Sequence, residues 1–168
     1  MTSYKNIIED FKLIAENHKQ INSFGTGDIE NLIYLTTQKD GNDNETNASP
    51  LYPLLYVIPG VVNRDTGSMT YNLSVLVMDI MSSDDVLLET QLLSDTLQMI
   101  DDVLAQFKYS VNPGTGLYQH KYDVNTTTSY TPFTERYDDF LVGWTLSIQV
   151  IVDVPIDRCG APFNPFQV

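Results

Sequence analysis

The chain has little of the chemistry that most active sites use. Its 168 residues include one cysteine, Cys159, and two histidines, His18 and His120, which lie far apart in the sequence. A single thiol excludes an internal disulfide, and a His/Cys metal site would need more ligands at closer spacing. No Gly-x-Ser-x-Gly elbow occurs, and the Gly-Thr-Gly segment at 114–116 is not followed by the Lys-Ser or Lys-Thr of a phosphate loop. We therefore expect no enzyme activity and no cofactor.

Positive charge is equally scarce. Nine Lys and Arg residues stand against 22 Asp and Glu residues, which gives a net charge of -13. Such a surface repels nucleic-acid phosphates, so we do not expect sequence-specific binding of DNA or RNA. The same acidity would suit a protein partner with a basic face, or a channel wall along which DNA passes without adhering. It would also serve solubility alone.

Long apolar runs are absent as well. No stretch approaches the roughly 18 to 20 apolar residues of a membrane-spanning helix, so no membrane partner is expected. A chain of this length is expected to form a single domain, residues 1–168, with enough buried surface for a substantial core.

The strongest pattern in the sequence lies between Phe140 and Val152. Apolar residues occupy every second position from Val142 through Trp144 to Val152, and polar residues such as Thr145 fall between them. This alternation predicts a long strand with one buried face and one solvated face.

The remaining pattern predicts a sheet with two main helices. A first helix should follow the cap Ser3 and run to about Gln20, and a long helix should cover Val86–Phe107 after the caps of Ser82–Asp85. Further strands are expected at Ile29–Thr37, Leu54–Val62 and Met69–Met81, the last two joined by a turn at Asn63–Gly67. The fold class is therefore α+β, an antiparallel sheet with the long helix and the N-terminal helix packed on one face.

Three segments do not fit this framework. The polar residues 38–53 and the irregular residues 111–134 are expected to be mobile excursions, the second holding one short strand near Tyr118–Tyr122. Residues 156–168 form an expected extended tail in which Phe163, Pro165 and Phe166 suit an inter-subunit contact. The tail could equally fold back on its own domain.

Acidic residues gather around the expected long helix. Asp65–Phe107 contains no Lys or Arg and eight acidic residues, whereas an ordinary solvated helix mixes both signs. The helix should therefore present one strongly negative outward face. Drift in an acidic protein would account for it, and so would a face turned toward a polyanion that must not adhere. The candidate channel-facing residues are Asp84, Asp85, Glu89, Asp95, Asp101 and Asp102.

The order of these elements resembles the tail-terminator and neck (head–tail connector) proteins of tailed bacteriophages. The closing strand, Val142–Val150, with its Trp followed by alternating apolar residues, is similar to the closing strands of that group. The resemblance implies a ring of identical subunits in the virion neck or tail, made in the host cytoplasm, with partners in adjacent rings. Passing genomic DNA would cross the ring without sequence-specific binding. The group has no catalytic signature, so no residue role is carried over.

Two other classes stay open at this stage. One is an acidic adaptor module whose binding to a basic protein would weaken with added salt. The other is a metal-dependent hydrolase using Asp101 and Asp102, which would need help from other carboxylates because neighbours on a helix do not share a face.

Overall fold

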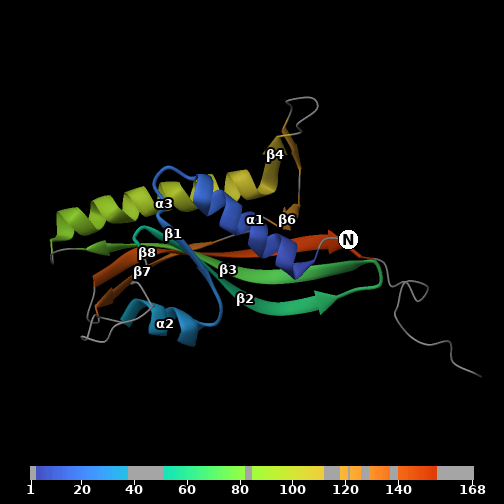
Figure 1. The fold of residues 1–168 in the computed structure, drawn as a ribbon, viewed down its shortest axis with the longest axis horizontal. Helices are drawn as coiled ribbons and strands as arrows, with labels where there is room; N and C mark the ends of the chain where they lie inside the picture. Colours follow the sequence, from blue (N-terminus) through green and yellow to red (C-terminus); the bar gives the residue numbers. More distant parts are fainter. Residues whose placement is uncertain are drawn as a thin grey trace, which may run out of the picture.

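The computed structural model describes residues 3–37, 51–81, 85–111, 118–120, 122–125, 129–136 and 140–154. The fold is α+β, as expected, with helices packed on a mixed sheet (Figure 1). In chain order the elements are α1 (Tyr4–Asn17), β1 (Ser23–Thr26), α2 (Ile29–Thr37), β2 (Leu54–Arg64), β3 (Ser68–Met81), α3 (Val86–Lys108), β4 (Tyr109–Val111), β5 (Tyr118–His120), β6 (Asp123–Asn125), β7 (Tyr130–Arg136) and β8 (Phe140–Asp153).

The central strands of the sheet are β3 and β8. They pair antiparallel and without a break from Ser68↔Asp153 to Met81↔Phe140, which confirms the long strand predicted from the alternation. The sheet order is β1-β2-β3-β8-β6, and β7 also pairs with β8. The expected purely antiparallel sheet is wrong at one edge, because β1 runs parallel to β2.

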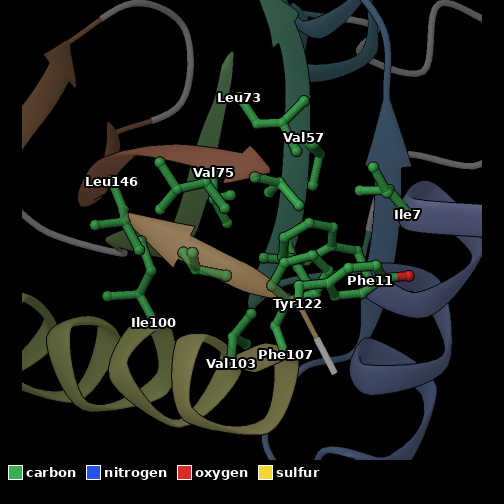
Figure 2. Close-up of a cluster of buried hydrophobic side chains, with 14 of the residues drawn as sticks. Ile7, Phe11, Val57, Leu73, Val75, Ile100, Val103, Phe107, Tyr122 and Leu146 are labelled. Atoms are coloured by element: carbon green, nitrogen blue, oxygen red, sulfur yellow. The ribbon is translucent and has the colours of Figure 1, made fainter. Parts of the chain in front are cut away.

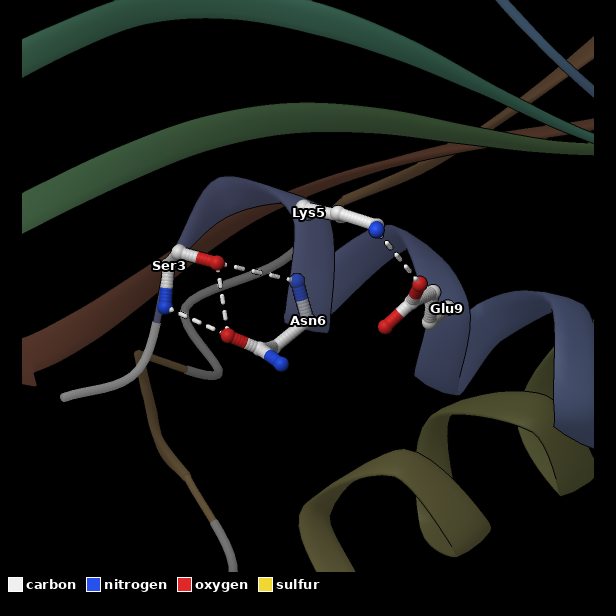
Figure 3. Close-up of polar contacts among 4 residues, drawn as sticks. All are labelled: Ser3, Lys5, Asn6 and Glu9. Atoms are coloured by element: carbon white, nitrogen blue, oxygen red, sulfur yellow. Dashed lines mark hydrogen bonds and ion pairs between the residues drawn. The ribbon is translucent and has the colours of Figure 1, made fainter.

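The N-terminal helix and the long helix cover the same face of the sheet, as predicted (Figure 1). Ser3 caps α1, where its hydroxyl accepts from the Asn6 N–H at 3.3 Å, and Lys5 pairs with Glu9 at 3.5 Å (Figure 3). The ring of Phe107 in α3 stacks against the ring of Phe11 in α1, with ring centroids 4.1 Å apart (Figure 2). This contact joins α1 and α3 above the sheet.

The predicted strand at Ile29–Thr37 is wrong: this segment forms α2, on the opposite face of the sheet (Figure 1). The Asp28 carboxylate accepts from the Asn31 N–H at 2.8 Å at the start of the helix. Leu32 then packs against the buried ring of Tyr56. The segment has strand propensity, but this capping bond and the burial of Leu32 outweigh it.

Cover on both faces explains the apolar run in β3. Val75 and Val77 point into the core under α3, whereas Leu76 and Met78 pack in the cluster with α2. All four are buried.

The excursion predicted at 111–134 is wrong for part of its length. It contains β5 near the expected position, but also β6 and β7, which both pair with β8 in the main sheet. Tyr and Thr favour strands, and β8 offered an edge to pair with. Residues 38–50 and 156–168 lie outside the described residues. The mobile excursion expected in the first segment and the extended tail expected in the second therefore stay predictions.

Candidate functional site

The long helix α3 carries most of the predicted site. Asp85 is its N-cap, and its carboxylate accepts from the Leu87 N–H at 2.9 Å, which satisfies one of the free donors of the first turn. The buried stripe is Thr96, Met99, Ile100, Val103 and Phe107. The Thr96 hydroxyl donates to the Leu92 carbonyl at 2.6 Å, so no polar group of that stripe is left unsatisfied.

One ridge of α3 is attached to the end of the sheet through hydrogen bonds. Glu89, Leu93 and Asp101 lie on an i, i+4 row of the helix. The Thr134 hydroxyl of β7 donates to Glu89 at 2.9 Å, and the Trp144 indole N–H donates to the Leu93 carbonyl at 2.7 Å. Glu89 and Leu93 are therefore turned toward the sheet.

Asp101 completes this ridge at its far end. The Tyr130 hydroxyl of β7 donates to Asp101 at 2.5 Å. Burial, together with this bond and the negative charge of Asp101, raises the pKa of Tyr130 to about 12. The phenol therefore stays protonated and bonded at neutral pH.

The other carboxylates of α3 lie toward different neighbours. Asp95 stands near Asp79 of β3, and burial together with this like charge raises the pKa of the Asp79 carboxyl above its usual range. Asp102 lies 3.6 Å from the imidazole of His18 at the end of α1. Neither carboxylate shares a partner with Glu89 or Asp101.

The expected single negative face of α3 is therefore wrong. Glu89 and Asp95 are half-buried, whereas Asp85, Asp101 and Asp102 are exposed. The helix also exposes the uncharged residues Ser94, Gln98 and Ala105. Counting charges in the sequence does not show which of these acids are half-buried and which are exposed. Their helical spacing from the buried stripe does show it. Of the remaining predicted residues, Asp84, Phe163, Pro165 and Phe166 lie outside the described residues.

The described residues do not assemble a metal site. Asp101 and Asp102 each face a different partner, and no three His, Cys, Asp or Glu side chains among the described residues come together where they could hold an ion. The described residues therefore supply no set of metal ligands for the hydrolase hypothesis.

Exposed apolar side chains are the feature that the sequence reasoning missed. Val86 and Leu87, the first two residues of α3, are 73% and 80% exposed. A periodic apolar pattern assigns such residues to the core, and here the first buried residue of the helix is Thr96. The available signal was their position in the first turn of the helix, before the periodic apolar pattern of α3 begins.

The described residues line a groove and a smaller hollow on the surface. A groove of about 980 Å³ runs between the end of α1 and the end of α3, with Leu13, His18, Lys19 and Ala105 among its lining residues. A smaller polar hollow of about 410 Å³ lies on the sheet face away from α1 and α3. There the amides of Asn125, Gln149 and Asn72 form a hydrogen-bonded row.

No protein-family model matches this chain, and no curated protein matches it in sequence. None of the described helices is both long enough and apolar enough to cross a membrane.

Proposed function

We propose that this chain is a structural subunit that assembles with copies of itself into a ring, in the neck or tail of a tailed bacteriophage. The ring surrounds the channel through which the genome passes and contacts adjacent neck or tail rings. The subunit acts by shape and charge and performs no bond chemistry.

The observation that carries this proposal is the pair of adjacent apolar side chains exposed on α3. Single exposed apolar residues are ordinary, but Val86 and Leu87 are neighbours and both are more than 70% exposed. A contact with another protein surface would remove them from water. Burial of these side chains stabilises an assembly most when every copy of the chain makes the same contact.

The open edge of the sheet supports the same assembly. β1 covers only Leu54–Val57 of β2, so residues 58–64 have no neighbouring strand on that edge within the described ranges. Val61 and Val62 are exposed there, at 71% and 45%. An uncovered edge of this kind is a surface for association.

Element order and charge support the phage assignment. The first helix, the β2–β3 hairpin, the long crossing helix and the closing strand follow the order on which the resemblance rests, although α2 replaces an expected strand. A net charge of -13 opposes adhesion of DNA. This charge belongs to the whole surface, because the predicted channel-facing acids lie on several sides of α3.

Light scattering after size-exclusion chromatography, with negative-stain microscopy, tests the assembly. We expect closed rings of several copies. A protein that stays monomeric at high concentration would contradict the ring. If that monomer captured a basic protein in low salt and released it in high salt, the adaptor function would replace our proposal. Mixing the rings with phage connector and tail-tube proteins tests the phage assignment, and we expect them to co-sediment.

A further inference from the structure

The smaller hollow, on the sheet face away from α1 and α3, is lined by two rows of polar residues that cross neighbouring strands. In the first row, Asn125 of β6 lies opposite Gln149 of β8, and Gln149 lies opposite Asn72 of β3. In the second row, Ser147 of β8 lies opposite Ser74 of β3 on the same face. The space of about 410 Å³ falls within the usual range of small-molecule sites, roughly 300–1,000 Å³.

Hydrogen bonds between neighbouring side chains hold the amides of the first row in place. The Asn125 amide donates to the Gln149 side-chain oxygen at 3.2 Å, and the Gln149 amide donates to the Asn72 side-chain oxygen at 3.0 Å. The Asn72 amide donates in turn to the Val61 carbonyl oxygen at 2.5 Å. Because these amides are already ordered, a ligand that binds them loses less affinity to the cost of immobilising side chains.

Both rows keep capacity for further hydrogen bonds. A primary amide has two N–H donors and an oxygen with two lone pairs, and the row uses one donor and one lone pair of Gln149 and of Asn72. The hydroxyls of Ser74 and Ser147 have no hydrogen-bond partner in the described part of the chain, and a hydroxyl both donates and accepts. The hollow therefore offers donors and acceptors side by side.

A β-bulge forms one wall of the hollow. Gly60 of β2 lines it, at the point where the register of β2 against β3 shifts between Pro59 and Val62. A Cβ atom at Gly60 would lie 2.9 Å from the backbone carbonyl oxygen of Asn72, so the glycine lets β2 stand close beside the amide row. Bulges are frequent next to binding sites because they redirect a strand locally.

The chemistry of the lining selects a class of ligand. The described residues that line the hollow are all uncharged and none is aromatic, in a chain whose net charge is -13. Such a lining lacks the carboxylates that hold a cation, the Lys or Arg that hold a phosphate and the ring on which a nucleobase stacks. It matches a neutral molecule whose groups each donate and accept, and the hydroxyl groups of a neutral sugar have this property.

We propose that this hollow binds a neutral saccharide, whose hydroxyl groups form hydrogen bonds with the amides of Gln149 and Asn72 and with the hydroxyls of Ser74 and Ser147. The inference goes beyond the proposed ring, because a single copy of the chain supplies the whole site. A chain that forms no ring would leave it unaffected.

Saturation-transfer NMR on the full chain tests the site, with maltose, cellobiose and lactose as neutral probes and glucuronate as the charged comparison. We expect a saturable signal from at least one neutral sugar, with a dissociation constant on the order of 1 mM, as a few neutral hydrogen bonds would give. Glucuronate should bind more weakly, because the negative field of the protein opposes it. The proposal would be overturned if no neutral probe gave a saturable signal, or if glucuronate bound as well as the sugars.

Two variants locate the binding on the hollow. Gln149→Ala and Ser147→Ala should each weaken the bound sugar about fivefold or more, because each removes hydrogen-bonding groups from the lining. Gln98→Ala, at an exposed amide on α3, is the matched control and should leave the affinity unchanged. Circular dichroism and thermal unfolding confirm that each variant is folded. Undiminished binding by both hollow variants, or an equal loss in Gln98→Ala, would show that the sugar does not occupy this hollow.

Discussion

At the residue scale, partial burial raises the pKa of the Asp79 carboxyl. Asp79 lies on the sheet face beneath α3, where its carboxylate accepts from the Ile80 N–H at 2.8 Å and stands near Asp95. Desolvation is the larger cause and the Asp95 charge the smaller one, and both raise the pKa of Asp79. A raised carboxyl pKa means that the folded state prefers the protonated acid.

We therefore predict that Asp79→Asn stabilises the protein at pH 7. The contribution of the Asp79 carboxyl to stability is full below its unfolded pKa and is lost as the pH rises through the higher folded value, so ionised Asp79 destabilises the fold. Asparagine keeps an acceptor for the Ile80 N–H and has no charge to desolvate. Thermal unfolding should show a melting temperature about 2–4 °C higher at pH 7, and the gain should shrink in acid.

Asp65→Asn is the matched control for this prediction. Asp65 also accepts from the N–H of its following residue, Thr66, at 2.7 Å, but it is exposed. Its substitution should leave the melting temperature nearly unchanged. An equal gain in both variants would show that net charge, and not the burial of Asp79, is responsible.

At the element scale, the pairing of β3 with β8 depends on a close approach of two backbones. Gly143 lies opposite Met78, and a Cβ atom at Gly143 would stand 2.1 Å from the Val77 carbonyl oxygen. The nearest obstacle is backbone, which a change of rotamer cannot move. A side chain there would therefore push the two central strands apart.

Gly143→Ala should lower the free energy of unfolding by about 1–3 kcal/mol or more, because overpacking in the sheet has no flexible neighbour to absorb it. Denaturant unfolding followed by the fluorescence of Trp144, which lies under α3, measures the change. Gly67→Ala is the control, since nothing lies within 4 Å of its added Cβ atom. Comparable losses at both positions would contradict the steric explanation.

At the scale of the whole molecule, net charge opposes assembly and local contacts favour it. A charge of -13 on every copy produces repulsion that acts over long distances. Burial of exposed apolar side chains such as Val86 and Leu87 would act at short range, where salt screens little. Assembly should therefore respond to ionic strength through the long-range term.

We predict that self-association strengthens as salt increases. Raising ionic strength from about 0.01 M to about 1 M shortens the Debye length from about 30 Å to about 3 Å, which screens the repulsion between copies. Sedimentation velocity at increasing sodium chloride should show a falling dissociation constant. Dissociation on adding salt would instead indicate an assembly held mainly by opposite charges.

The sequence by itself determined the parts of this protein that follow from local periodicity. The alternation in Phe140–Val152 and the helical repeat in Val86–Phe107 specify their elements because each must bury one face. The cap at Ser3 likewise marks the start of α1. These predictions needed no knowledge of neighbouring chain segments, and the α+β class followed from them.

Only the tertiary structure decided what depends on contacts between distant residues. Ile29–Thr37 became a helix because the sheet offered Tyr56 and its neighbours for Leu32 to cover, and Tyr130–Arg136 became a strand because β8 had a free edge. The acids of α3 took separate partners for the same reason. Which partner a side chain takes depends on the residues that pack against it, and those residues are distant in the sequence.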